Sequence, residues 1–338
     1  MRDRTRRVLV LALAWIALAV CARSATAAPE LKPLESAGQY AAPPGAPYIA
    51  EEIVVEGTGY ALAGTLTRPR GARGRLPAVL LITGAAPQDR DNTAGGSDYR
   101  PFREIADALA RHGIATLRLD DRGVGASTGS LRGITTAERA TDASIALAFQ
   151  RARHDIDGSR LALLGHSEGA SIATMLAAED RALRGLVLMS SPAETGRAMM
   201  SRQYRHRADT DSTIPDSMRD SAYVLAMESW DERVSSDAWT RFFSAYDPVA
   251  AARNVRTPVL LLQGGADENL GAEDADRLAA AFRAAGDKDV KVLMFEGLMH
   301  SMLRKDAFGP DGVVAKGGLE LPAAVLGAVV DWLRPHLR

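Results

Sequence analysis

The sequence has 338 residues, of which 46% are hydrophobic and 25% are charged, and its formal net charge is −1. This length and balance predict a globular protein with one large domain, or with one domain and an insertion. The sequence has no basic tract suited to a nucleic-acid partner. Cys21 is the only cysteine and lies near the N-terminus, so the rest of the chain has no disulfide, cysteine nucleophile or cysteine metal ligand.

Residues 1–28 have the pattern of a secretory signal peptide. Four of the first seven residues are arginine, the apolar run Val8–Val20 follows, and Ala25–Ala27 supplies small residues at cleavage spacing. We expect cleavage near Ala27 or Ala28, export to the periplasm or the exterior, and no stable membrane insertion afterwards. An uncleaved membrane anchor is the alternative, although an apolar run of 13 residues is short for a bilayer.

Lipidation at Cys21 would be a third fate for this segment. It is disfavoured because Val20 stands immediately before Cys21, where lipoprotein signals have a small residue. The segment carries five arginines and one aspartate, so its removal would change the formal net charge from −1 to −5. After it, residues 29–50 are rich in Pro, Ala and Gly without periodicity, which predicts an N-terminal arm or linker.

From Glu51 onward, apolar runs of strand length alternate with segments of helical periodicity. This alternation predicts an α/β fold in which helices cover both faces of a mostly parallel central sheet. The first two strands are separated by a hairpin signal, Glu56-Gly57-Thr58-Gly59. Strands are predicted at Glu51–Val55, Tyr60–Leu66, Pro77–Thr83, Ala115–Leu119, Leu161–Leu164, Gly185–Met189, Val259–Gln263 and Val290–Phe295. Helices are predicted at Arg100–Arg111, Thr136–Arg153, Ala170–Ala178, Ala272–Ala285 and Pro322–Leu333.

The alternation is interrupted between residues 194 and 246, where the sequence is rich in Arg, Ser, Asp and Met. Helices without intervening strands are predicted there, around Thr195–Arg207, Ser217–Met227 and Ser236–Phe243. We interpret this segment as a helical cap inserted into an α/β core. The predicted organisation is therefore a core of residues 51–193 and 247–338, with the cap at 194–246.

The strand Leu161–Leu164 ends abruptly in Gly165-His166-Ser167-Glu168-Gly169, and a helix pattern begins at Ala170. This is the G-x-S-x-G arrangement between a strand and a helix. A strand that turns directly into a helix strains its apex residue and leaves no room for side chains two residues away. The sequence therefore predicts Ser167 as a nucleophile raised at the positive end of a helix.

A serine hydroxyl needs a base to take its proton, and the base needs an orienting acid. In this architecture both follow the serine in the chain, on loops at the same edge of the sheet. His300 follows a late strand, Val290–Phe295, and we predict it as the general base. The other histidines adjoin the serine, lie at the opposite sheet edge, or lie in the cap or the C-terminal tail: His166, His112, His154, His206 and His336.

Asp267 follows the strand Val259–Gln263, which precedes the strand before His300, and we predict it as the orienting acid. Glu268 is its nearest rival. Asp247 precedes a proline where the cap rejoins the core, which favours a turn or helix-capping role.

Backbone amides are expected to form the oxyanion hole of the tetrahedral intermediate. The amide of Glu168 is one candidate, because it follows the nucleophile at a helix start. The second donor is expected after the strand Pro77–Thr83, at Ala85 or otherwise at Ala86. Residue type does not discriminate between the two alanines, since only the backbone is required.

Two other segments resemble known motifs without completing them. Asp89–Asn92 begins like a calcium loop, but Thr93 and Ala94 break the EF-hand pattern, so a structural ion-pair loop near the site is expected. The turn 121–125 is too short for a dinucleotide fingerprint, and Asp121 and Arg122 are expected to fix it. We therefore expect neither a metal nor a cofactor.

Together these motifs resemble the α/β-hydrolase superfamily, and more narrowly its bacterial serine hydrolases of the esterase, thioesterase or serine-aminopeptidase type. The resemblance covers about Glu51 to Arg334. Relatives often have Gly-Ser-Gly-Pro where this chain has Gly84-Ala85-Ala86-Pro87, which leaves the second oxyanion donor open. The resemblance rests on Leu80–Gly84, Pro87–Asp91, Asp121–Ser127, Gly165–Gly169, Leu262–Asp267 and Gly297–His300.

The triad order and this resemblance predict a serine hydrolase that cleaves carboxylic esters or related acyl compounds through an acyl-enzyme intermediate. Its expected partner is a small acyl substrate. The alternatives on the same residues are an exported peptidase or amidase, and an acyltransferase. Outside enzymes, the alternative is a binding protein on a hydrolase scaffold. The sequence does not determine the acyl chain length, the preference among esters, thioesters and amides, or the oligomeric state.

Overall fold

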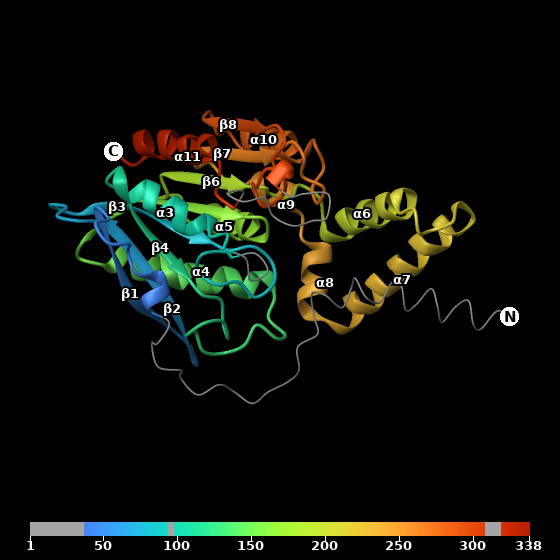
Figure 1. The fold of residues 1–338 in the computed structure, drawn as a ribbon, viewed down its shortest axis with the longest axis horizontal. Helices are drawn as coiled ribbons and strands as arrows, with labels where there is room; N and C mark the ends of the chain where they lie inside the picture. Colours follow the sequence, from blue (N-terminus) through green and yellow to red (C-terminus); the bar gives the residue numbers. More distant parts are fainter. Residues whose placement is uncertain (1–36, 94–97, 308–318) are drawn as a thin grey trace.

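The computed structural model describes residues 37–93, 98–307 and 319–338, so the expected signal peptide lies outside the described residues. An eight-stranded sheet in the order β1-β2-β4-β3-β5-β6-β7-β8 forms the centre of the fold (Figure 1). β1 and β2 pair antiparallel, as do β2 and β4, and the other neighbouring strands are parallel. The strands are β1 (Tyr48–Gly57), β2 (Tyr60–Pro69), β3 (Leu76–Ile82), β4 (Ala115–Leu119), β5 (Ile156–His166), β6 (Gly185–Met189), β7 (Val259–Gly264) and β8 (Val290–Phe295).

Successive side chains of a strand point to opposite faces of the sheet, so a strand with apolar residues throughout has two apolar faces. Helices cover both of them. Leu80 of β3 packs in an apolar cluster with α4, α5 and α10, whereas Val79 and Leu81 pack in a second cluster with α3 and α11. The prediction of a mostly parallel sheet between two helical layers is confirmed. The helices are α3 (Pro101–Arg111), α4 (Thr136–Ala152), α5 (Glu168–Glu179), α9 (Pro248–Ala252), α10 (Asp274–Ala284) and α11 (Ala323–His336). None of the described helices has both the length and the apolarity to span a membrane.

The described end of the N-terminal arm joins the core instead of standing apart as a linker. β1 begins at Tyr48, earlier than the predicted Glu51, because it pairs with β2 in continuous register back to Pro69. Upstream, α2 (Ala37–Tyr40) places the buried Tyr40 ring 4.0 Å from the Arg90 guanidinium. The first strand and this contact hold the start of the described chain against the sheet.

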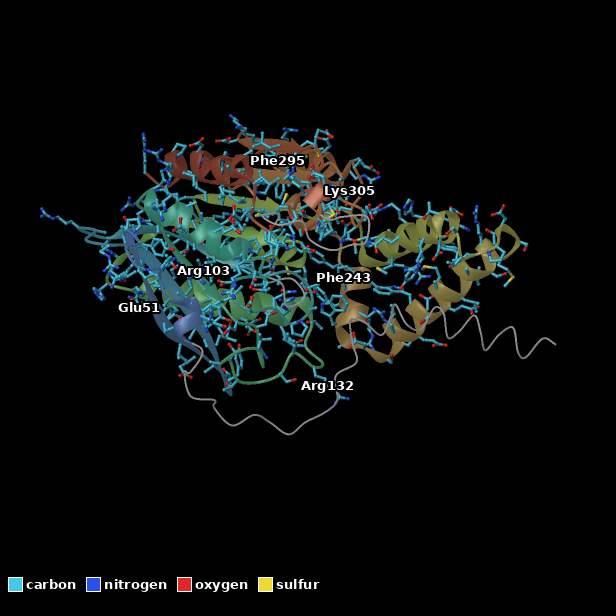
Figure 2. The ribbon with its side chains drawn as sticks, viewed as in Figure 1. Glu51, Arg103, Arg132, Phe243, Phe295 and Lys305 are labelled. Carbon is cyan, nitrogen blue, oxygen red and sulfur yellow. The ribbon has the colours of Figure 1, made fainter. Side chains whose placement is uncertain are left out.

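Four α-helices and a short 3-10 helix (Asp216–Met218) lie between β6 and β7 in the chain. We call the first three α-helices the cap helices: α6 (Gly196–Thr210), α7 (Arg219–Ser236) and α8 (Ala238–Ala245). Figure 1 shows α6 and α7 extending away from the sheet, with α8 closer to the core. Phe243 of α8 lies where the cap helices meet the core (Figure 2). Its ring stacks on Trp239, with centroids 4.9 Å apart and an interplanar angle of 8°.

The predicted end of α7 at Met227 is wrong, because the helix continues to Ser236. Trp230 lies in the additional part, is buried, and donates from Nε1 to Ser244 Oγ at 2.8 Å. Packing against α8 therefore extends the helix beyond what the local pattern indicates.

Two aspartates set the starts of the helices that follow. The Asp237 carboxylate accepts from the Thr240 amide as an N-cap, so α8 begins at Ala238 and not at the predicted Ser236. Asp247 caps α9 in the same way, through the Ala250 amide at 3.0 Å, which agrees with its expected role.

Candidate active site

Ser167 occupies the turn between β5 and α5. β5 ends at His166 and α5 begins at Glu168, so one residue makes the whole turn. Its φ of 56° and ψ of −118° are strained for a residue with a side chain. A Cβ on Gly165 would overlap the Gly169 carbonyl group, and a Cβ on Gly169 would overlap the end of β3. Both glycines are therefore required by close backbone approach.

His300 and Asp267 form a hydrogen-bonded chain with this serine. His300 Nε2 lies 3.0 Å from Ser167 Oγ, and His300 Nδ1 lies 2.9 Å from Asp267 Oδ2. The three residues follow β5, β7 and β8, which are parallel and end at the same edge of the sheet. The Asp267 side chain is 2% exposed and that of His300 21%. Such an arrangement can pass a proton from serine to imidazole and stabilise the imidazolium.

The two neighbouring acids, Asp267 and Glu268, have different surroundings. Asp267 Oδ1 accepts hydrogen bonds from two backbone amides of the following turn, at 2.9 and 3.1 Å. Burial acts in the opposite direction, but the hydrogen bonds from His300 and these amides lower the pKa of Asp267. Glu268 forms an ion pair with Lys305 at 2.8 Å, and these side chains are 71% and 61% exposed. Asp267 is thus the acid that contacts the histidine.

The backbone beside the His300 ring is held by side chains that sequence reasoning missed. The His300 carbonyl oxygen accepts hydrogen bonds from Ser190 Oγ at 2.8 Å and from His166 Nε2 at 3.0 Å. The Ser301 carbonyl accepts from Tyr99 OH at 2.7 Å. Of these side chains, only Ser190 could have been expected near the site from the sequence, because it follows β6 directly, at the sheet edge where Ser167 lies.

His166 also connects this loop to the one after β3. Because its Nε2 donates to a carbonyl, its Nδ1 is an acceptor, and Asn92 Nδ2 lies 3.3 Å from it. Asn92 Oδ1 accepts from the Gly84 amide at 3.1 Å. Desolvation and the neighbouring His300 lower the pKa of His166 to about 4, so the imidazole is neutral at pH 7. His166 is a structural contact between two loops.

The candidate oxyanion amides lie on the loop after β3 and at the first residue of α5. Within the described residues, the amides of Ala85, Ala86 and Glu168 donate to no other protein group. The Gly84 amide, in contrast, is taken by Asn92. Ala86 has a φ of 66°, in the left-handed region, so the chain turns sharply here. Both alanine amides remain available, so the assignment of Ala85 as the second oxyanion donor stays a prediction, with Ala86 as the alternative.

Arg139 of α4 connects the loop after β3 with the nucleophile turn, and no sequence signal indicated it. Its Nη1 forms an ion pair with Glu168, with the two side chains 7% and 2% exposed. Its Nη2 lies 3.0 Å from the Gly84 carbonyl oxygen and 3.0 Å from Asp121 Oδ2. Trp239 Nε1, from cap helix α8, donates to Glu168 Oε1 at 2.7 Å. A cap residue thus contacts the residue next to Ser167.

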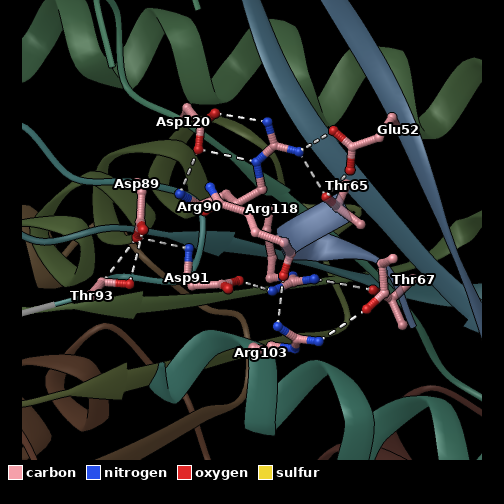
Figure 3. A network of polar contacts seen from close by, with 12 residues as sticks. Glu52, Thr65, Thr67, Asp89, Arg90, Asp91, Thr93, Arg103, Arg118 and Asp120 are labelled. Atoms are coloured by element: carbon pink, nitrogen blue, oxygen red, sulfur yellow. Dashed lines mark hydrogen bonds and ion pairs between the residues drawn. The ribbon is translucent and has the colours of Figure 1, made fainter. Parts of the chain in front are cut away.

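The polar segment after β3 forms ion pairs, in agreement with the expected structural loop (Figure 3). Arg90 Nη2 lies 2.7 Å from Asp120 Oδ2, and its Nη1 lies 2.6 Å from Glu52 Oε2. Arg118 pairs with Asp91, and both side chains are buried. Burial raises the pKa of Asp91 and lowers that of Arg118, while their mutual attraction opposes both changes. Among the residues that the structure describes, no group of three or more His, Cys, Asp or Glu is placed to hold a metal ion.

Comparison with known proteins agrees with this geometry. A model of the family described as serine aminopeptidase, S33, matches residues 95–306, more than half of the chain. Esterase EstD from Thermotoga maritima is 28% identical over 289 residues, which cover 84% of this chain and 67% of that protein.

Solved structures share the fold at low sequence identity. The esterase Pf2001 of Pyrococcus furiosus has a TM-score of 0.59 at 13% identity, with 94% of this chain and 98% of that chain covered. Est1E from Butyrivibrio proteoclasticus, solved with ferulic acid bound, has a TM-score of 0.58 at 19% identity, with 84% and 99% covered. Likeness at this level shows the fold alone. With the family match, it makes this chain a hydrolase of the serine aminopeptidase S33 family, within the α/β-hydrolase superfamily.

Proposed function

We propose that the protein is a carboxylesterase in which Ser167 is the nucleophile, His300 the general base and Asp267 the orienting acid. The observation that carries the proposal is the hydrogen-bonded chain from Ser167 Oγ through the imidazole to the Asp267 carboxylate, at 3.0 and 2.9 Å. The relative named esterase EstD supports an ester as the substrate class. A small acyl ester is the substrate on this proposal.

The reaction divides into acylation and deacylation. Ser167 Oγ attacks the ester carbonyl while its proton moves to His300 Nε2, and the carbonyl oxygen becomes an oxyanion. The amides of Glu168 and Ala85 bind that oxyanion. The bond to the alkoxy group then breaks, and the alcohol leaves with the proton from Nε2. Water attacks the acyl-enzyme by the same route, which releases the acid and restores the serine hydroxyl.

Hydrolysis of amides or small peptides is the second candidate, because the matching family is described as serine aminopeptidase. It uses the same residues, but the imidazolium must protonate an amine instead of an alkoxide. Export belongs to the proposal as well, and it rests on the pattern of residues 1–28, which lie outside the described chain.

The test compares substitutions of the neighbouring acids Asp267 and Glu268, and it compares ester with amide substrates. On p-nitrophenyl acyl esters, Ser167→Ala is expected to lower kcat at least about 10³-fold, and Asp267→Asn about 10⁴-fold, since it traps the wrong tautomer of the base. Glu268→Gln removes the adjacent carboxylate from an exposed ion pair, so it should leave kcat unchanged. Full activity in Ser167→Ala would overturn the mechanism. Faster turnover of aminoacyl p-nitroanilides than of esters would favour the second candidate.

A further inference from the structure

We propose that Arg139 is a positioning residue that holds both amides of the oxyanion hole at once, and that Trp239 ties this arrangement to the cap helices. The inference deepens the proposed function and rests on it. The side chains that carry it come from three helices: Arg139 from α4, Glu168 from the start of α5 and Trp239 from α8.

The first contact of Arg139 is with the loop after β3. Its Nη2 donates to the Gly84 carbonyl oxygen at 3.0 Å. That carbonyl belongs to the same planar peptide group as the Ala85 N–H. The hydrogen bond therefore fixes the direction of the Ala85 N–H and, by polarising the peptide, strengthens it as a donor.

The same loop is held at its far end by Asp121, the counter-ion of Arg139. Asp121 Oδ2 accepts from the Gln88 amide at 2.9 Å and pairs with Arg139 Nη2 at 3.0 Å. Asp121 Oδ1 accepts from Thr83 Oγ1 at 3.1 Å. Residues 84–88 are thus fixed at both ends by one ion pair, which gives the turn residue Asp121 a definite role beside the site.

The second contact of Arg139 is with the nucleophile turn. Its Nη1 pairs with Glu168 Oε2 in a site where the two side chains are 7% and 2% exposed. Thr136 Oγ1, from the first turn of α4, donates to Glu168 Oε1 at 2.5 Å. Because the Glu168 amide is the other oxyanion donor, one guanidinium holds the peptide of one donor and the side chain of the other. A lysine has no planar fork and cannot reproduce both contacts.

The guanidinium stays charged in this position. Burial alone lowers the pKa of Arg139, but the attraction of Asp121 and Glu168 outweighs burial and raises the pKa. A charged donor also forms stronger hydrogen bonds than a neutral one, so the Gly84 carbonyl receives the stronger kind of contact.

Trp239 extends the arrangement to the cap. Its Nε1 donates to Glu168 Oε1 at 2.7 Å, while its indole stacks on Phe243 of the same helix. Phe243 in turn lies against Gly196 at the start of α6, where an added Cβ would overlap the Phe243 ring. A displacement of the cap helices would therefore remove the hydrogen bond from Trp239 to Glu168. The position of the cap helices would in this way affect the residue that supplies one oxyanion amide.

The experiment uses Arg139→Lys and Arg139→Gln, with Arg122→Gln as the matched control. Arg122 is a half-buried arginine that pairs with Asp142 at 2.5 Å, and it contacts neither Gly84 nor Glu168. Circular dichroism and the Tm of each variant establish that it is folded. The readouts are kcat and KM for p-nitrophenyl butyrate, and the inhibition constant of an alkyl trifluoromethyl ketone, whose hemiketal with Ser167 carries the same oxyanion.

Arg139→Lys is expected to lower kcat about 100-fold with KM within about twofold, because the donors act on the transition state more than on the bound ester. The inhibition constant of the ketone should rise by about the same factor. Arg122→Gln should change neither quantity by more than about twofold, whatever it does to Tm. A folded Arg139 variant that keeps kcat within about threefold of wild type, or that loses kcat without losing ketone affinity, would overturn the positioning role.

Trp239→Phe tests the cap link without risk to the fold, since it keeps the stacked ring and removes only the N–H. We expect kcat to fall about threefold to tenfold. In the double variant with Arg139→Lys the loss should be smaller than the product of the two single losses, because both residues act through Glu168. A loss equal to that product would refute the link.

Ser167→Ala distinguishes a failure of the proposed function from a failure of the positioning role. If Ser167→Ala is still active, the proposed function is refuted. If Ser167→Ala is inactive while the Arg139 variants are fully active, only the positioning role is refuted.

Discussion

Replacement of His166 by glutamine tests how the contacts behind the candidate active site make stability depend on pH. His166 Nε2 donates to the His300 carbonyl, and the pKa of His166 is lowered from 6.5 to about 4. In the unfolded chain the imidazole titrates near its ordinary value of about 6.5. Between these two pKa values the unfolded state binds a proton that the folded state does not. The contribution of His166 to stability is therefore complete above pH 6.5 and is lost as the pH falls toward 4.

The size of the effect follows from the two pKa values. Between pH 7.5 and pH 5, titration of this one group should lower the free energy of unfolding by about 2 kcal/mol, at about 1.4 kcal/mol for each pH unit inside the window. Glutamine takes up no proton but keeps an N–H group that can reach the same carbonyl. Urea unfolding at the two pH values gives the free energies, and His112→Gln, at an exposed histidine, is the control. Equal pH-dependent losses in wild type and His166→Gln would refute the reasoning.

Three further substitutions test packing, two of them close to the site and one in α11. Asp91→Asn leaves the buried Arg118 without its counter-charge, and we expect the free energy of unfolding to fall by about 3–5 kcal/mol. Asp209→Asn, at an exposed helical ion pair with Arg205, is its control and should change the free energy of unfolding by less than about 1 kcal/mol. Gly264→Ala drives a Cβ into a backbone carbonyl of the loop after β8, so stability should fall by about 1–3 kcal/mol, with a lower kcat as Asp267 shifts. Gly327→Ala, in α11 where nothing lies within 4 Å of the new Cβ, should instead raise stability by up to about 1 kcal/mol. Unchanged urea midpoints in Asp91→Asn or Gly264→Ala would contradict these assignments.

The α/β alternation could be predicted because strands buried on both faces are continuous apolar runs with polar ends. Pro77–Thr83 and Val259–Gln263 correspond closely to β3 and β7 for this reason. The candidate site could be predicted in part because parallel strands bring their carboxyl ends to one edge. The G-x-S-x-G turn, with the chain order expected for the acid and the histidine, therefore selected Ser167, Asp267 and His300, and in the structure His300 lies within hydrogen-bond distance of the other two.

The contacts around these residues could not be predicted, since they join positions that are distant in the chain. Arg139 and Trp239 lie 29 and 71 residues from their common partner Glu168. An arginine in an amphipathic helix is usually a surface residue, and only the positions of Glu168 and Asp121 explain its burial. The end of α7 was mispredicted for a related reason, because Trp230 extends that helix by tertiary packing.

The position of β8 at the border of the sheet has a consequence for how the protein fails. β8 is the last strand in the sheet order, Met294 within it is 42% exposed, and His300 follows it. Segments at a sheet border open locally at free energies below that of global unfolding. Such an opening would carry His300 away while Ser167, at the end of the central strand β5, stays in place. If Ser167 and His300 act together as proposed, we expect the opening of β8 to abolish activity before the protein unfolds globally.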